Sequence, residues 1–230
     1  MEVYESKVKV YLLKDVKCED IQIEICKIID SALVKDDQWR EFHNKNQFKN
    51  YCFDCPYPIP ADKVYKSGQI YTFTVRTIDA KLANYLNQLL GNEYNSTIKC
   101  LTAEKRIIPK KFIEKIYSLT SVVIRDDLGY WKDKLSLKDF ERRLKENLIK
   151  KYNNINNTKI DENFELYTSI EFKNKKPCPV KYKNIILLGD KISLNISDDK
   201  IAQEIAYMAI GTGIGDSNSR GNGFINYRYL

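Results

Sequence analysis

Hydrophobic and polar residues alternate along the first strand-like segment of the chain, "EVYESKVKVYLL". A period of two is typical of a β-strand that packs one face on a core and turns the other toward water. We therefore predict a strand here. Its expected core positions are Val3, Val8, Val10 and Leu12.

The pattern changes to a helical period between Glu19 and Leu33. Five apolar residues recur there at i, i+4, i+7, i+8 and i+11, which places them in one stripe along an α-helix. The stripe consists of Ile21, Ile25, Ile28, Ile29 and Ala32. The segment is expected to be an amphipathic helix.

Two more strands, a second helix and a fourth strand are predicted in the rest of the first half. Asp79 has the side chain of a helix N-cap, and Gly91 is placed to end the same helix. The predicted elements are the strands 48–53 and 68–77, the helix 80–90 and the strand 95–103.

The second half repeats this order of elements. They are a strand over 118–125, a helix over 137–151 behind Ser136, strands over 164–172 and 183–196, a helix over 199–209 and a strand over 223–230. Two strand-helix-strand-strand-helix-strand units predict an α+β fold of two tandem ferredoxin-like (RRM-like) domains with antiparallel sheets. We place the domains at 1–115 and 116–230.

Charge and hydropathy point to a class of partner. The chain has no apolar run of about 18 residues, so we expect a soluble cytoplasmic protein without a membrane span. Its 38 Lys and Arg against 31 Asp and Glu give a net charge of +7, which favours a polyanionic partner such as nucleic acid or an anionic membrane surface. A lysine bias of an AT-rich genome is the other explanation of this charge.

Metal and cofactor chemistry finds little support in the sequence. Cys52 and Cys55 form a C-x-x-C, but a zinc site needs two more ligands, and neither a second C-x-x-C nor a histidine pair follows. The remaining acidic pairs lie near turns and helix starts, where caps are expected rather than a two-metal centre. These pairs are Asp36-Asp37, Asp126-Asp127 and Asp198-Asp199. We predict no metal site and no cofactor.

Glycines gather between the last helix and the last strand. Five of the nine in the chain lie within thirteen residues there: Gly211, Gly213, Gly215, Gly221 and Gly223. Dinucleotide and P-loop motifs place glycines before a helix instead, so neither motif is present. One interpretation is a helix end and a turn. The other is backbone brought close to a ligand, with N–H groups on phosphate oxygens, and Asn218 and Arg220 within the segment favour it.

The segment "GTGIGDSNSRGNGF" before a C-terminal strand, on a tandem ferredoxin-like pattern, resembles the glycine-rich loop of CRISPR repeat-processing endoribonucleases, the Cas-six family of the RAMP superfamily. The resemblance covers the chain end to end, including "FHNKNQFKNYCF" and "YKSGQIYTFTVRTIDAKLANYL". It implies metal-independent cleavage of CRISPR precursor RNA within repeats, by 2′-hydroxyl attack that leaves a 2′,3′-cyclic phosphate and a 5′-hydroxyl. A non-catalytic guide-RNA-binding subunit with the same fold is the alternative.

The resemblance also implies catalytic residues. His43 is the one histidine of the chain and lies where the family places its catalytic histidine, as general base or general acid. Lys49 matches a catalytic lysine that some members carry six residues further on, and Lys45 is a second candidate. Those members have a tyrosine on the first helix, which this chain lacks, so Tyr51 is the candidate substitute.

RNA contacts are expected at two places, and CRISPR repeat RNA is the expected partner. The resemblance favours the glycine-rich segment and a lysine cluster between two strands. The predicted contacts are Gly211, Gly213, Gly215, Asn218, Arg220, Gly221, Gly223, Lys173, Lys175 and Lys176. The sequence leaves open whether the protein acts as a monomer, as a homodimer or within an interference complex.

Overall fold

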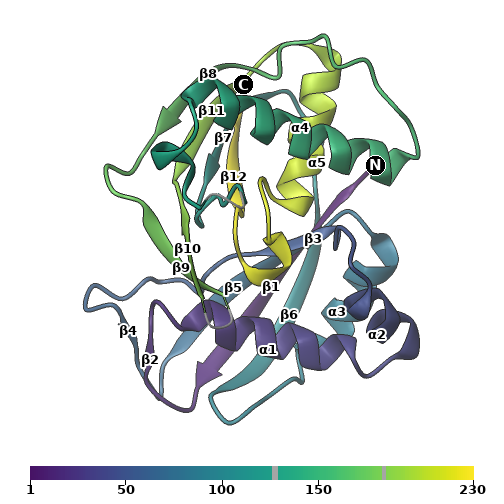
Figure 1. The fold of residues 1–230 in the computed structure, drawn as a ribbon. Coiled ribbons are helices and arrows are strands. Elements are labelled where there is room, and N and C mark those ends of the chain that lie inside the picture. The colour runs from purple at the N-terminus through teal and green to yellow at the C-terminus, as the bar shows by residue number, and fades with distance from the viewer. Residues whose placement is uncertain (126–128, 183–184) are drawn as a thin grey trace. The chain divides into compact units, whose positions relative to one another are not determined.

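The computed structural model describes residues 1–125, 129–182 and 185–230. The described chain forms two units, each built around its own sheet (Figure 1). The first unit comprises Met1–Ile108 with Ser219–Gly221, and the second comprises Pro109–Asn218 with Asn222–Leu230.

The first unit has the strand order of a ferredoxin-like fold. Its elements are β1(Val3–Leu12), β2(Val16–Lys17), α1(Ile21–Leu33), α2(Asp37–Asn44), β3(Tyr51–Phe53), β4(Val64–Tyr65), β5(Ile70–Thr77), α3(Ala80–Leu90) and β6(Ile98–Ile108). The antiparallel sheet runs β3-β5-β1-β6, and β2 pairs with β4 apart from it. The central strands β1 and β5 are thus the first and third of the repeat, as the predicted fold requires.

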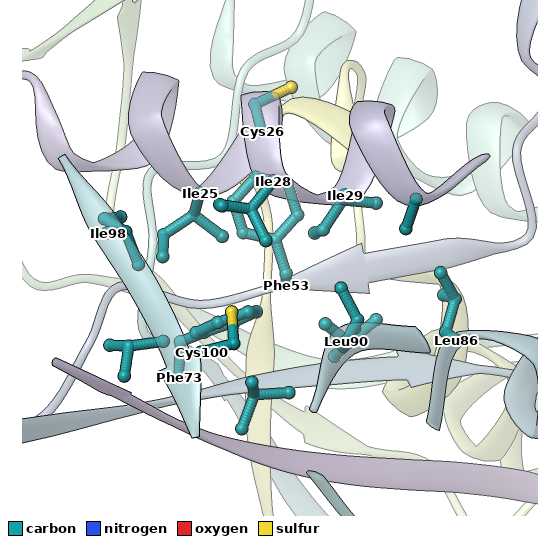
Figure 2. Packing of buried hydrophobic residues seen from close by; sticks show 14 of the residues in the cluster. Ile25, Cys26, Ile28, Ile29, Phe53, Phe73, Leu86, Leu90, Ile98 and Cys100 are labelled. Carbon is teal, nitrogen blue, oxygen red and sulfur yellow. The ribbon is translucent and has the colours of Figure 1, made fainter. Parts of the chain in front are cut away.

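A hydrophobic core joins α1 and α3 to this sheet (Figure 2). The isoleucines of the predicted α1 stripe are fully buried, and Figure 2 shows three of them pointing toward the sheet, where Phe53 and Phe73 lie. Each such side chain contributes about 1.5–3 kcal/mol by leaving water. Cys26 points to the other side of α1. One side of the helix therefore anchors it, and another remains available for polar contacts.

The second unit repeats the arrangement. Its elements are β7(Ile113–Ser118), η1(Trp131–Asp133), α4(Leu137–Asn156), β8(Tyr167–Phe172), β9(Cys178–Tyr182), β10(Ile185–Gly189), β11(Ile192–Ile196), α5(Lys200–Thr212) and β12(Ile225–Tyr229). The antiparallel sheet runs β12-β7-β11-β8, while β9 and β10 form a hairpin of their own. The predicted α+β fold with tandem antiparallel sheets is confirmed.

The predicted helix starts are confirmed by their caps. The carboxylate of Asp79 accepts hydrogen bonds from the backbone N–H groups of Lys81 and Leu82 at the start of α3. Ser136 and Asp139 form a reciprocal capping box at the start of α4. α5 continues to Thr212, so Gly211 is helical rather than part of a loop.

The strand predicted over 118–125 is wrong. The strand of this region is β7, which ends at Ser118; its buried residues Ile113 and Ile116 are three positions apart, so the strand lacks the alternating pattern that would predict it. Val122, in the apolar run that suggested a strand, is buried but forms only an isolated bridge to Asp190. A short apolar run indicates a buried segment, but it does not show whether that segment forms a strand.

The strand predicted over 183–196 is two strands, β10 and β11, separated at Asp190 and Lys191. Residues 183 and 184 of that prediction lie outside the described residues. The strand β9 was not predicted; it contains Pro179, a residue that is uncommon inside strands.

Our domain limits, 1–115 and 116–230, fall inside β7, whereas the second unit starts at Pro109. Those limits remain a prediction. In the part of the chain that the structure describes, no helix has both the length and the apolar character that crossing a membrane requires.

Candidate active site

The helix α2 carries His43 and was not predicted from the sequence. Asp36 caps it by accepting a hydrogen bond of 3.2 Å from the backbone N–H of Trp39. Trp39 is buried and packs edge-on against Phe42 and, at 5.6 Å between ring centroids, against Tyr85 of α3. The indole thus anchors a short, mostly polar helix to the core of the first unit.

Lys49 closes the C-terminal end of α2. Its Nζ donates to the backbone carbonyls of Phe42 at 2.6 Å and of His43 at 2.9 Å, and also to that of Lys45. Helix ends leave such carbonyls without partners, so the ammonium supplies the missing donors. Burial lowers the pKa of Lys49, and the charge of Arg220 lowers it further. Lys49 therefore lies beside His43 but is occupied in holding the turn that carries it.

The imidazole of His43 faces a carboxylate on α1. Its Nδ1 lies 3.5 Å from Oδ1 of Asp30, and its side chain is 20% exposed. That Oδ1 atom is buried and accepts no hydrogen bond from the described residues. A buried carboxylate oxygen without a donor is uncommon, and the ring nitrogen of His43 is placed to supply one.

Arg220 holds the other oxygen of the same carboxylate. Its Nη1 donates to Oδ2 of Asp30 at 2.6 Å and to Sγ of Cys26 at 2.7 Å. Burial lowers the pKa of Arg220, but Cys26 and Asp30 together raise it by more, so the guanidinium stays charged. Burial and the neighbouring Asp30 raise the pKa of the Cys26 thiol to about 11, so the thiol is neutral at pH 7. One carboxylate thus bridges an arginine and the single histidine.

The side of α1 that carries Asp30 also fixes the segment Ser219–Gly221. Gln22, Cys26 and Asp30 lie at i, i+4 and i+8 and form one stripe on the helix. Nε2 of Gln22 donates to the carbonyl of Gly221 at 2.5 Å. Gly221 has a φ of +87°, and a Cβ there would lie 2.7 Å from Gln22 Nε2. The close approach that places Arg220 therefore requires glycine.

Alanine at Gly221 is expected to move Arg220 away from Asp30 and to slow at least tenfold the RNA cleavage that the sequence resemblance predicts. The matched control is Gly68→Ala, because Gly68 has a similar φ of +79° but its nearest neighbour would be Tyr11 Oη at 3.8 Å. Both variants should lose about 1 kcal/mol of stability to the positive φ. Single-turnover rates and thermal melts of the two proteins make the comparison. Equal rates would show that the close approach at Gly221 does not matter.

The remaining glycines shape the second unit. Gly213, Gly215 and Gly223 all have positive φ, and a Cβ at Gly223 would lie 1.8 Å from the carbonyl oxygen of Ile214. Their segment is buried, and the N–H groups of Gly213 and Gly223 donate to carbonyls of the chain itself. The glycines thus let the backbone pack on itself, and RNA contacts at these positions, including helical Gly211, stay a prediction.

A buried lysine holds this segment. Nζ of Lys151, on α4, donates to the carbonyls of Gly213 at 3.2 Å and Gly215 at 2.8 Å and to Oδ1 of Asn218 at 2.6 Å. Asn218 itself donates to the carbonyls of Ile214 and Asn222. The predicted RNA contact Asn218 is therefore a hydrogen-bonded part of the fold of the second unit, and its contact with RNA stays a prediction.

Among the other candidates, Tyr51 lies near the Asp30 carboxylate. Lys45 is exposed and pairs with Glu41 at 2.7 Å. Tyr51, on β3, is fully buried, which raises the pKa of its phenol, and its side chain interacts with Ser219. The lysine cluster lies in the second unit, exposed between β8 and β9. It consists of Lys173, which pairs with Glu171, and Lys175 and Lys176.

The acidic pairs serve as caps where the structure describes them. Asp36 caps α2 and Asp199 caps α5, while Asp126 and Asp127 lie outside the described residues. Within the described ranges, no three His, Cys, Asp or Glu side chains gather as a metal site would need. Asp30 was not singled out from the sequence, because a lone carboxylate on the polar side of a helix gives no signal of its own.

Known proteins are similar to this chain in sequence and in fold. The profile of the family described as "CRISPR associated protein Cas6, C-terminal" matches residues 108–227, more than half of the chain. The chain belongs to this Cas6 family. A relative named CRISPR-associated endoribonuclease Cas6 2, from Methanocaldococcus jannaschii, is 25% identical over 213 residues, which cover 85% of this chain and 87% of the relative. The predicted family resemblance is confirmed.

Solved Cas6-like structures superpose on nearly the whole chain. One is described as a RAMP protein binding different RNA substrates; it has a TM-score of 0.73 at 16% identity and covers 98% of this chain and 99% of its own. Another, of a Cas6-related gene from Pyrococcus furiosus, has a TM-score of 0.68 at 16% identity and covers 98% of each chain. At these identities the likeness concerns the fold.

Proposed function

We propose that this Cas6 family member is an endoribonuclease that cleaves CRISPR precursor RNA within its repeats and so releases guide RNAs. The observation that carries the proposal is the contact of the single histidine with the Asp30 carboxylate, which also binds Arg220. Family membership supports CRISPR repeat RNA as the substrate. Two features of the site support the reaction class that the family resemblance implies: an imidazole that can exchange a proton and a positive charge held beside it.

The proposed reaction uses the RNA's own 2′-hydroxyl. Its oxygen attacks the adjacent phosphorus, the bond from phosphorus to the 5′-oxygen breaks, and a 2′,3′-cyclic phosphate and a 5′-hydroxyl result. The attacking hydroxyl loses a proton and the leaving oxygen gains one. His43 carries out one of these two transfers, a role in which an imidazole can either accept or donate a proton, and solvent completes the other.

Arg220 is proposed to neutralise the charge that gathers on the phosphate oxygens. Its Nη1 is bound to Asp30 and Cys26, and among the described residues no hydrogen bond is made by its Nη2 or Nε. A charged, partly buried guanidinium with free donors suits a developing oxyanion. Lys49 remains a candidate for the same role, although its ammonium already contacts three carbonyls.

Cleavage of the host's repeat RNA is expected to proceed at the same rate in excess EDTA as in magnesium. Arg220 supplies the charge that a metal ion would otherwise bring, and the described residues hold no metal-ligand cluster. Gel sizing of labelled products over time measures the rate. Loss of cleavage in EDTA with recovery in manganese or magnesium would refute a metal-free centre. Tight binding without cleavage in either buffer would favour the non-catalytic guide-RNA-binding subunit.

A further inference from the structure

Asp30 occupies a distinctive place in the first unit. It lies on the side of α1 opposite the apolar stripe, and its two carboxylate oxygens face different partners, Arg220 and His43. Oδ1 of Asp30 is buried and accepts no hydrogen bond from the described residues. Burying such an oxygen costs free energy unless a donor pairs with it.

We propose that Asp30 is a positioning residue that fixes the orientation and the proton of His43 and aligns Arg220 beside it. Oδ1 accepts the proton carried by Nδ1 of the imidazole, and Oδ2 accepts from Nη1 of Arg220. The neutral ring then keeps its proton on Nδ1, which leaves Nε2 as the nitrogen that exchanges a proton with RNA. The catalytic consequence rests on the proposed function, whereas the proton position does not.

The geometry needs one small adjustment. The 3.5 Å between His43 Nδ1 and Asp30 Oδ1 exceeds the usual N–H···O range of about 2.7–3.2 Å by a few tenths of an ångström. Catalytic hydrogen bonds are often long without substrate and shorten when it binds. Oδ2 is held at 2.6 Å by Arg220, so a slight turn of the imidazole closes the contact without moving the carboxylate.

The charges around Asp30 favour this arrangement. Arg220, from the segment Ser219–Gly221, brings one positive charge, and Lys49, from the segment after α2, brings another. Cys26 on α1 and Tyr51 on β3 also face the carboxylate, but burial raises the pKa of both, so neither adds a negative charge at pH 7. Among these groups the Asp30 carboxylate is therefore the acceptor that is free of competing negative charge, which suits it to receive the N–H of His43.

Asparagine at position 30 should reverse the proton position. Arg220 has donors only, so it takes the single amide oxygen, and the amide NH₂ then faces Nδ1 of His43. Nδ1 must accept that hydrogen bond, which moves the ring proton to Nε2. In Ser-His-Asp proteases the equivalent Asp→Asn change leaves the geometry intact but produces the wrong tautomer.

The test uses the fact that His43 is the only histidine in the chain, because its ring nitrogens give one set of ¹⁵N signals. Long-range ¹H–¹⁵N spectra are recorded on the full-length protein at a pH where the ring is neutral. The wild type is expected to carry the proton on Nδ1, and Asp30→Asn on Nε2. Asp30→Asn should also cleave repeat RNA at least tenfold more slowly with unchanged affinity. The control, Glu24→Gln, alters a carboxylate on the same helix that pairs with Lys27; it should match the wild type in both readouts.

The tautomer of His43 and the cleavage rate together decide the proposal. A wild-type proton on Nε2, or an unchanged tautomer in Asp30→Asn, overturns the proposal, and the wild-type spectrum alone suffices if the variant does not fold. A reversed tautomer with a wild-type cleavage rate overturns the catalytic part. If the wild type has its proton on Nδ1, the variant reverses it and neither protein cleaves repeat RNA, the positioning of the proton stands and the proposed function fails.

Discussion

Replacement of His43 by alanine is expected to slow single-turnover cleavage of repeat RNA by about 10²- to 10⁴-fold, the usual contribution of a general acid or base. The reason is local: the imidazole beside Asp30 can both accept and donate a proton, and His43 is the single histidine of the chain. Its side chain is 20% exposed and lies at the end of a helix anchored by Trp39, so its removal should not disturb the core.

Measuring the affinity for repeat RNA beside the cleavage rate distinguishes a catalytic role of His43 from a binding role. His43→Ala should bind repeat RNA about as tightly as the wild type, because one neutral ring contributes little to phosphate contacts. Gln38→Ala, an exposed position on the same helix, is the control and should cleave normally. A His43→Ala protein that cleaves at the wild-type rate would remove the proposed catalytic residue. One that loses affinity and rate in equal measure would make His43 a binding residue.

Much of the fold could be predicted because the periodicities are strong. The α1 stripe from Ile21 to Ala32 is fully buried as expected, and Asp79 caps α3. The errors arose where the pattern is short or mixed. α2 has only eight residues and depends on Trp39 for its packing, and the apolar run 122–124 is buried without a strand. Tertiary contacts, which no local pattern contains, decide both cases.

The site was predictable only in part. His43 could be singled out because it is the sole histidine and lies where the family resemblance places a catalytic one, and the same resemblance made Lys49 the candidate partner. The structure puts the Lys49 ammonium on the carbonyls behind His43 instead. Asp30 and Arg220 are 190 residues apart in the chain, and nothing local indicates that they meet. Contacts of this kind depend on the fold as a whole.

The glycine-rich segment shows how one sequence signal can have two physical causes. Its glycines were interpreted as backbone approaching RNA. Gly221 does make a close approach, to Gln22 and Phe53, and it thereby places Arg220 on Asp30. Gly221 thus serves the placement of Arg220, the other glycines of the segment let the backbone of the second unit pack on itself, and the proposed RNA contact would come through Arg220. Sequence alone could not tell which surface the backbone approaches.

The central claim is that RNA supplies its own nucleophile at the His43 centre. A repeat RNA with a single 2′-deoxy nucleotide on the 5′ side of the scissile phosphate tests it most directly, because only the attacking oxygen is removed. The wild-type protein should bind both RNAs alike, convert the unmodified one to products ending in a 2′,3′-cyclic phosphate and a 5′-hydroxyl, and leave the deoxy RNA intact. Cleavage of the deoxy RNA at the same phosphate would contradict the account, since water would then be the attacking group.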